Sequence, residues 1–112
     1  MKSITKYAGL LSALVLCASV ARAAESAELW TKNCASCHGK DGAGHTKAGH
    51  MKHVKDMTSA EYQKSFTDDQ AAARIKEGYK GDNGEEKMKA FGSVLSDAEV
   101  KSLVGYVRSL QK

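Results

Sequence analysis

The chain has 112 residues, with 17 lysines and arginines against 13 aspartates and glutamates, and a formal net charge of +4. Three of the basic residues and none of the acidic ones lie in residues 1–23, so residues 24–112 carry 14 basic residues against 13 acidic ones, a net charge of +1. A chain so close to neutral lacks the basic surface of a nucleic-acid-binding protein. Its length predicts one compact domain with a modest core.

Residues 1–23 have the pattern of an export signal. Two lysines precede an apolar run over residues 8–20, and Ala21-Arg22-Ala23 is a small-x-small cleavage site. The run is shorter than the ~20 apolar residues of a membrane-spanning helix. We predict a signal peptide that is cleaved after Ala23, export to the periplasm, and no stable membrane insertion afterwards. An uncleaved membrane anchor is the alternative.

The next segment, residues 24–38, predicts a helix that begins near Ser26 as its N-cap. Trp30, Cys34 and Cys37 follow at helical spacing, so one face carries the indole ring and both thiols. His38 comes directly after the second cysteine. This helix would therefore present two thiols and an imidazole together.

Cys34 and Cys37 have three alternatives to a cofactor role. A disulfide over so short a loop would gain little stability, and its geometry is often strained. A thioredoxin-like redox pair needs a βα pattern, and a zinc site needs two further ligands; the sequence has neither. The pattern Cys-x-x-Cys-His is typical of covalent haem attachment. It predicts thioether bonds from Cys34 and Cys37 to the haem vinyl carbons, with His38 as an axial ligand of the iron.

Residues 39–56 contain four glycines and predict a loop that turns tightly beside a flat cofactor. The loop also holds His45, His50 and His53, which could form a second metal site or supply another iron ligand. No carboxylate or thiol joins them at ligand spacing, so a solvated polar loop is the better interpretation.

Three N-terminal capping patterns follow. They begin at Thr58, Thr67 and Ser96, each with Glu or Gln three residues later, and predict helices near 59–65, 68–78 and 97–111. Gly78 is suited to end the second of these helices. The last helix has an apolar stripe at helical spacing: Val100, Leu103, Val104, Val107 and Leu110. Strand signals are essentially missing, so the fold class is all-α, with about four short helices around the haem.

Residues 79–94 form a second glycine-containing loop, and this one carries Met88. A methionine thioether is a soft neutral ligand that favours reduced iron, so a His–Met pair suits electron transfer. The other methionines of residues 24–112 are less suitable, since Met57 precedes a helix start and Met51 lies soon after the haem motif. We predict Met88 as the second axial ligand, with ordinary packing as the alternative.

Four segments resemble those of small bacterial class I monohaem cytochromes c, and the resemblance extends over nearly all of residues 24–112. They are Cys34-Ala35-Ser36-Cys37-His38-Gly39, Asp41-Gly42-Ala43-Gly44, Met88-Lys89-Ala90-Phe91-Gly92, and Leu95 through Arg108. The resemblance implies a cytochrome c domain whose first and last helices cross near Trp30 and Tyr106, with covalent haem c and His38 and Met88 as axial ligands of its iron. It also implies a monomeric periplasmic electron carrier, without enzymatic activity, that docks transiently with redox partners.

The sequence departs from that family in three places. Ser26 stands where the family usually has glycine at the helix crossing, and Lys89 stands where it often has proline. The chain has no proline, although the family commonly uses a proline carbonyl to orient its axial histidine. A carbonyl within residues 45–56 is expected to orient His38 instead.

Two questions about function stay open in the sequence. Four lysines, at positions 52, 55, 87 and 89, could steer acidic partners or could be scattered solubilising charges. The rival functions are ligand binding or catalysis at an open iron position, and a subunit of a larger respiratory complex.

Overall fold

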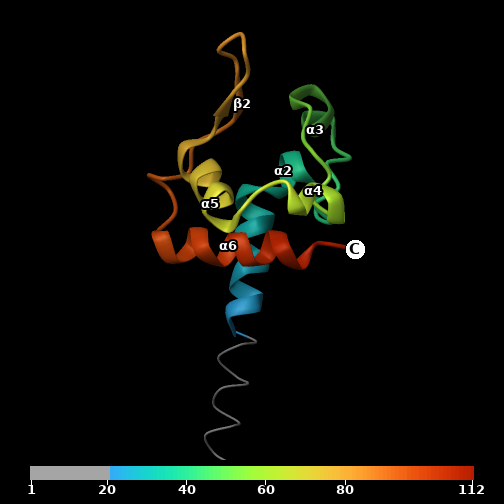
Figure 1. The fold of residues 1–112 in the computed structure, drawn as a ribbon. Coiled ribbons are helices and arrows are strands. Elements are labelled where there is room, and N and C mark those ends of the chain that lie inside the picture. The colour runs from blue at the N-terminus through green and yellow to red at the C-terminus, as the bar shows by residue number, and fades with distance from the viewer. Residues whose placement is uncertain (1–20) are drawn as a thin grey trace, which may run out of the picture.

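The computed structural model describes residues 21–112, which are mostly helical (Figure 1). Residues 21–33 form an N-terminal helix, followed after a turn at Cys34 by the other elements. In chain order they are α2 (Ala35–His38), α3 (Lys47–Lys52), α4 (Ala60–Lys64), α5 (Asp68–Glu77), β1 (Tyr79–Lys80), β2 (Glu86–Met88) and α6 (Asp97–Ser109). The expected all-α class is confirmed, with a small two-stranded sheet added to it.

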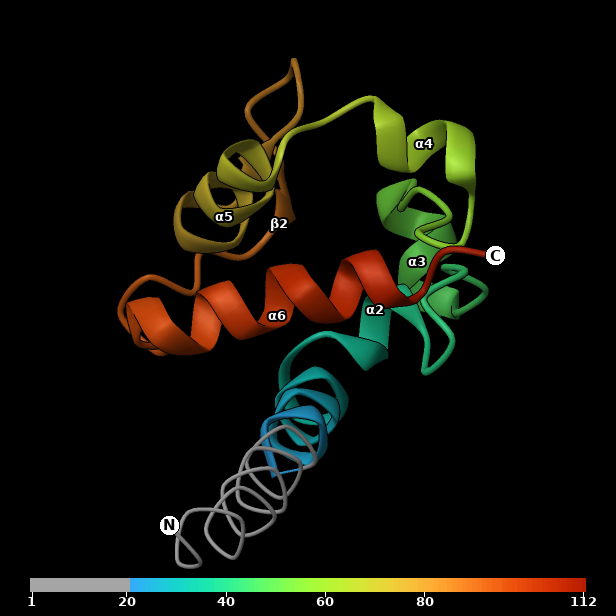
Figure 2. The ribbon, with the colours of Figure 1, turned by 60° about the horizontal axis from the view of Figure 1, so that its bottom comes forward.

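The N-terminal helix crosses α6 (Figure 2), as the family resemblance implied. At this crossing the ring centroids of Trp30 and Tyr106 lie 5.2 Å apart. Trp30 is only 3% exposed and belongs to the main core, which α6 supplies with four residues. The core members are Trp30, Ile75, Phe91, Leu95, Val100, Leu103, Val104 and Val107. The predicted apolar stripe of the last helix is thus confirmed, with Leu110 partly buried at its end.

The helix starts follow the capping patterns closely. Thr67 and Ser96 both form complete capping boxes, in which the side chain of Gln70 or Glu99 returns to the backbone of the cap. The remaining start is displaced by one residue, because Ser59 rather than Thr58 caps α4. Two backbone donors at each box therefore gain acceptors, which explains why these boundaries could be read from the sequence.

Two expectations about the first half of the chain were wrong. The Ser26 hydroxyl donates to the carbonyl of Arg22 inside the helix, so Ser26 is not an N-cap in this structure. The loop predicted over residues 39–56 contains the helix α3, capped by Thr46, whose hydroxyl accepts from the Gly49 amide. A helix of six residues, fewer than two turns, is too short for a periodic apolar pattern to reveal it.

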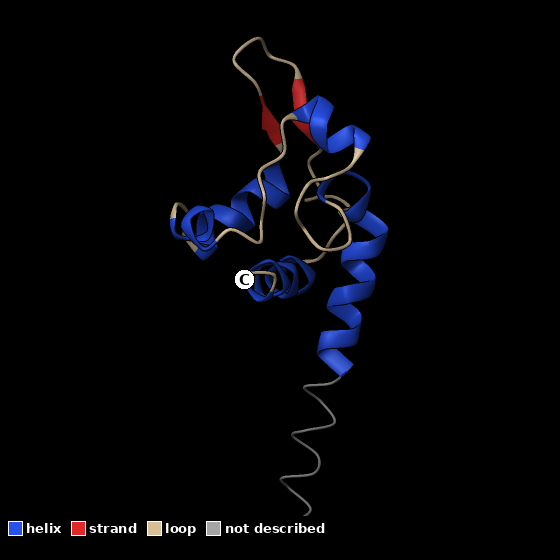
Figure 3. Ribbon diagram, turned by 90° about the vertical axis from the view of Figure 1, so that its right-hand side faces the viewer, coloured by secondary structure: helices blue, strands red, loops and turns tan. Residues whose placement is uncertain are grey.

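The expectation of no strands was also wrong. β1 and β2 pair antiparallel, with Tyr79 opposite Met88 and Lys80 opposite Glu86, and the register shifts between these pairs. The hairpin forms the end of the molecule that lies opposite the N-terminal helix (Figure 3). Strands of two and three residues offer too few positions for an alternating pattern, so the sequence could not indicate them.

Candidate functional site

Cys34 and Cys37 lie together at the start of α2, half-buried and not disulfide-bonded. Burial, and then the nearby Cys37, raise the pKa of Cys34 to about 11. A cysteine that acts as a redox nucleophile has a lowered pKa instead, because its thiolate is the reactive form. This pair is therefore poorly suited to thiol–disulfide exchange, which weakens the redox-pair alternative.

The backbone that carries the two thiols is held from several sides. The Trp30 indole Nε1 donates to the Gly39 carbonyl at 2.9 Å, the Thr46 hydroxyl donates to the Cys37 carbonyl at 2.7 Å, and the Gly44 amide donates to the His38 carbonyl at 2.8 Å. These bonds satisfy the carbonyls at the end of α2, which the short helix leaves without helical partners. The turn is consequently fixed in the protein itself.

Close packing between α3 and this turn adds to that rigidity. A Cβ atom at Gly49 would lie 2.6 Å from the Cys37 carbonyl and 2.8 Å from the Thr46 hydroxyl, so no larger residue fits there. The sequence analysis did not single out Thr46 or Gly49. Threonine is a residue type favoured at helix N-caps, but Thr46 lacks the Glu or Gln three residues later that marked the other helix starts.

His38 follows the thiols, and its ring lies beside Trp30, with the two ring centroids 5.6 Å apart. Its Nδ1 atom is buried and has no hydrogen-bond partner in residues 21–112, so the carbonyl expected from residues 45–56 is not found. Burial lowers the pKa of His38, which favours the neutral imidazole that binds metals. A buried neutral imidazole beside two free thiols fits a site built to receive a metal-containing group.

Met88 comes from a different part of the molecule, at the end of β2. It is half-buried and packs against the edge of the main core. A Cβ atom at Gly78 would lie 2.5 Å from the Met88 carbonyl, so the base of the hairpin presses directly on the end of α5. The Phe91 amide also donates to the Ile75 carbonyl at 2.9 Å, which fixes the chain just after Met88.

The hairpin and α3 approach each other through Lys52, the last residue of α3. Its Nζ donates to the Glu86 carbonyl at 2.8 Å and lies 3.7 Å from the Glu85 carboxylate. Lys87 pairs with the same carboxylate at 2.8 Å. Two of the four lysines considered for partner steering therefore share one negative charge, which weakens any basic patch here.

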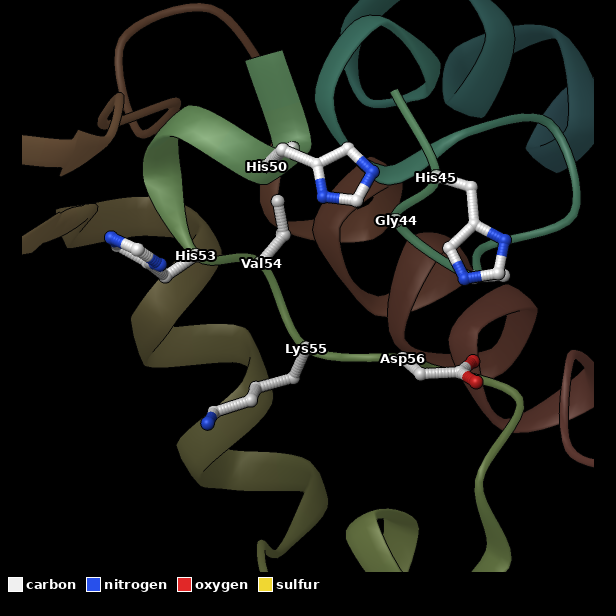
Figure 4. A pocket seen from close by; sticks show the side chains of 9 residues that line it. Gly44, His45, His50, His53, Val54, Lys55 and Asp56 are labelled. Atoms are coloured by element: carbon white, nitrogen blue, oxygen red, sulfur yellow. The ribbon is translucent and has the colours of Figure 1, made fainter. Parts of the chain in front are cut away.

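The three loop histidines line a shallow pocket with Asp56 and Lys55 (Figure 4). The rings of His45 and His50 are parallel, with centroids 6.4 Å apart, while the ring of His53 points away from them (Figure 4). Residues 21–112 contain no group of three or more His, Cys, Asp or Glu side chains placed to hold a metal ion. The polar-loop interpretation is therefore favoured over a second metal site.

None of the helices in residues 21–112 is long and apolar enough to cross a membrane. The predicted signal peptide covers residues 1–23, most of which lie outside the described residues. Where the described helix begins, residues 21–23 continue directly into the rest of the N-terminal helix.

A helical fold around two free thiols and an adjoining imidazole defines a c-type cytochrome. A family model described as cytochrome c oxidase, cbb3-type, subunit III matches residues 21–107, and the chain belongs to this cytochrome c family. It carries covalently bound haem c with iron, and the free thiols and the buried imidazole of His38 fit that group.

Individual relatives agree with this assignment. The chain is 30% identical over 90 residues to a cytochrome c6 of Picosynechococcus sp., covering 80% of this chain and 74% of that protein. Among solved structures, the KustC0563 c-type cytochrome has a TM-score of 0.70 and 32% identity, over 78% of this chain and 98% of that one. A point mutant of the same protein has a TM-score of 0.68 and 31% identity, over 78% of this chain and 99% of that one. The chain is accordingly a haem-based electron carrier.

Proposed function

We propose that this cytochrome is a periplasmic one-electron carrier whose iron is ligated axially by His38 and Met88. Cys34 and Cys37 form the thioether bonds to haem. The observation that carries the proposal is the fixed turn at residues 34–39, which presents two free thiols and a neutral imidazole from one short segment. The bound haem supplies an iron that cycles between its ferric and ferrous states.

Each residue contributes a different property to this site. The thioethers at Cys34 and Cys37 keep the cofactor attached in a compartment where the cell could not easily replace it. The neutral imidazole of His38 donates to iron without a change of protonation. The thioether of Met88 is a soft ligand that stabilises ferrous iron and so raises the reduction potential. A site closed on both faces leaves no position for a substrate, which is why we propose a carrier without enzymatic activity.

Export and partner binding complete the proposal. The signal peptide over residues 1–23 sends the chain to the periplasm, where it acts as a monomer that docks transiently with redox proteins. Because Glu85 neutralises part of the charge of Lys52 and Lys87, we expect only a weak dependence of electron-transfer rates on ionic strength. A rate that falls steeply between low and high salt would contradict this expectation.

Visible spectra of the ferric holoprotein test the axial ligands. The wild type should be low-spin and show the weak far-red band of methionine-to-iron charge transfer. Met88→Ala should lose this band and become high-spin, because the iron loses one ligand. Met51→Ala is the matched control, since Met51 is 66% exposed and should leave the spectrum unchanged. A high-spin wild type would instead indicate an open iron position, as in a ligand-binding or peroxidase-like protein.

A second candidate function is suggested by the name of the matching family model, which refers to an oxidase subunit. In that case the protein would remain bound to a larger respiratory complex rather than diffuse. Native gel migration of the exported protein, released without detergent, separates the two functions. Migration as a free monomer supports the diffusing carrier, whereas migration with a large complex supports the subunit.

A further inference from the structure

Lys52 makes a contact that joins two parts of the chain far apart in sequence. Its ammonium group donates to the carbonyl of Glu86, 34 positions later in the chain, at 2.8 Å. The Glu85 carboxylate lies 3.7 Å away on the neighbouring residue. The side chain is 37% exposed, so water only partly competes for the ammonium group.

The N-terminal end of this connection is rigid. Lys52 is the last residue of α3, and α3 is capped by Thr46, whose hydroxyl also donates to the Cys37 carbonyl. Gly49, in the middle of α3, is packed against that same carbonyl. Lys52 is therefore built onto the segment that carries His38.

The other end of the connection is less firmly held. The base of the hairpin is attached to α5 through the Phe91 amide and through Arg74, whose guanidinium lies 4.1 Å from the centre of the Tyr79 ring. Within residues 21–112, no hydrogen bond or ion pair other than those of Lys52 joins residues 79–88 to a segment before α5. The acceptor, Glu86, lies two residues before Met88.

We propose that Lys52 is a positioning residue that holds the Met88 hairpin in place relative to His38. This inference rests on the proposed ligation of iron by Met88. The hydrogen bond to the Glu86 backbone limits the distance that β2 can move away from α3. Glu85 keeps the ammonium group at that carbonyl, although it shares its charge with Lys87. When this link opens, the Met88 thioether leaves the iron more often.

The variant Lys52→Met removes the donor and keeps an unbranched side chain. Lys55→Met is the matched control, because Lys55 lines the same surface pocket as Lys52 and Lys87 and the change removes the same charge. Two measurements on the holoprotein are needed. The first is amide hydrogen exchange at Gly81, whose amide donates to the Glu85 carbonyl inside the hairpin. The second is the rate at which imidazole binds ferric iron, which requires the sixth ligand to leave.

We expect Lys52→Met to raise both rates about three- to tenfold above Lys55→Met, the range for one partly exposed, charge-assisted hydrogen bond. Lys52→Arg should restore slow rates, because its guanidinium can also donate to the carbonyl. Equal exchange at Gly81 in the Lys52 and Lys55 variants would overturn the proposal. A different outcome is that Lys52→Met exchanges faster at Gly81 while the wild type itself lacks the methionine–iron band. That outcome would refute Met88 ligation, and with it the effect on iron, while the hairpin attachment would stand.

Discussion

His38 and Met88 are the two proposed ligands of the iron. The segment that carries His38 (the His38 side) and the segment that carries Met88 (the Met88 side) are held by different kinds of interaction. On the His38 side, a buried indole, a threonine hydroxyl and a backbone amide each donate to a carbonyl within one turn of chain. On the Met88 side, a short exposed hairpin is fixed at its base to α5 and reaches α3 through one lysine (Figure 1). Segments with few buried contacts open at lower free energy, so the Met88 side should open first.

This difference has a functional meaning for an electron carrier. The covalently attached side needs no motion once haem is in place, and rigidity there lowers the cost of reorganising the site. The hairpin that carries Met88, the proposed second ligand, has to hold its position without a covalent bond to the haem. The attachment of this hairpin at its base and through Lys52 holds it in place and still allows it to open.

The largest expected effect is on the rigid side. Trp30→Ala should lower the free energy of unfolding by about 3–5 kcal/mol, because it removes a large aromatic side chain that is 3% exposed. Chemical denaturation of the holoprotein, monitored by circular dichroism, measures this free energy. Trp30→Phe keeps most of the apolar volume and loses the bond to the Gly39 carbonyl, so it should cost only about 0.5–1.5 kcal/mol. Equal losses for the two variants would mean that the hydrogen bond, rather than packing, holds this side.

A smaller and more local effect is expected for Gly78→Ala on the Met88 side. Gly78 has φ +73°, and its Cβ would collide with the Met88 carbonyl and lie 2.8 Å from the Ala90 amide nitrogen. The left-handed backbone alone costs about 1–2 kcal/mol for a residue with a Cβ. The methionine–iron band should weaken while covalent haem attachment is retained.

Gly105→Ala is the control for this glycine substitution. Gly105 lies within α6, and a Cβ atom there meets nothing within 4 Å. The change should stabilise the protein by up to about 1 kcal/mol and leave the band unchanged. If Gly78→Ala also left the band unchanged, the hairpin base would not control the position of Met88.

The smallest expected effect is on the stability of the fold, through an ion pair between α5, to which the hairpin base is attached, and α6. Lys76 of α5 pairs with Asp97 of α6 at 2.7 Å, and this contact lowers the pKa of Asp97 below its usual 3.8. Because the folded-state pKa is the lower one, the pair stabilises the fold above pH 4 and loses that contribution as the pH falls through the lowered value. The wild type should therefore exceed Asp97→Asn in stability slightly at pH 7, and this difference should be smaller at pH 3. Thermal melts of both proteins at the two pH values measure this difference in stability. A difference that stays the same at both pH values would exclude the charge of Asp97 as its cause.

Several parts of the fold could be predicted because their causes are local. Thr67 and Ser96 cap helices through residues only three positions away, and Gly78 ends α5 with a positive φ that glycine adopts easily. The predicted proximity of Trp30 and Tyr106 came from the family resemblance rather than from local pattern, and the structure confirms it. The Cys-x-x-Cys-His motif could also be recognised in the sequence, because its five residues, 34–38, are consecutive.

Other parts depended on contacts that no local pattern records. Ser26 lies inside a helix because the chain before it is helical, and β1 and β2 pair although neither is long enough to show alternation. The expected carbonyl for His38 Nδ1 is not found among the described residues, and part of the segment that was to supply it forms α3. Tertiary packing decided each of these outcomes.

The sequence by itself determined the helical class, and it gave Cys34 and Cys37 as the proposed haem attachment residues and Met88 as the proposed second ligand. These follow from residue chemistry and short-range spacing. Only the tertiary structure decided that the His38 side is fixed by hydrogen bonds from Trp30 and Thr46 while the Met88 side is a hairpin reaching α3 through Lys52. The physical reason is that this contact joins residues 34 positions apart, and a hydrogen bond to a backbone carbonyl leaves no mark on the identity of the residue that accepts it.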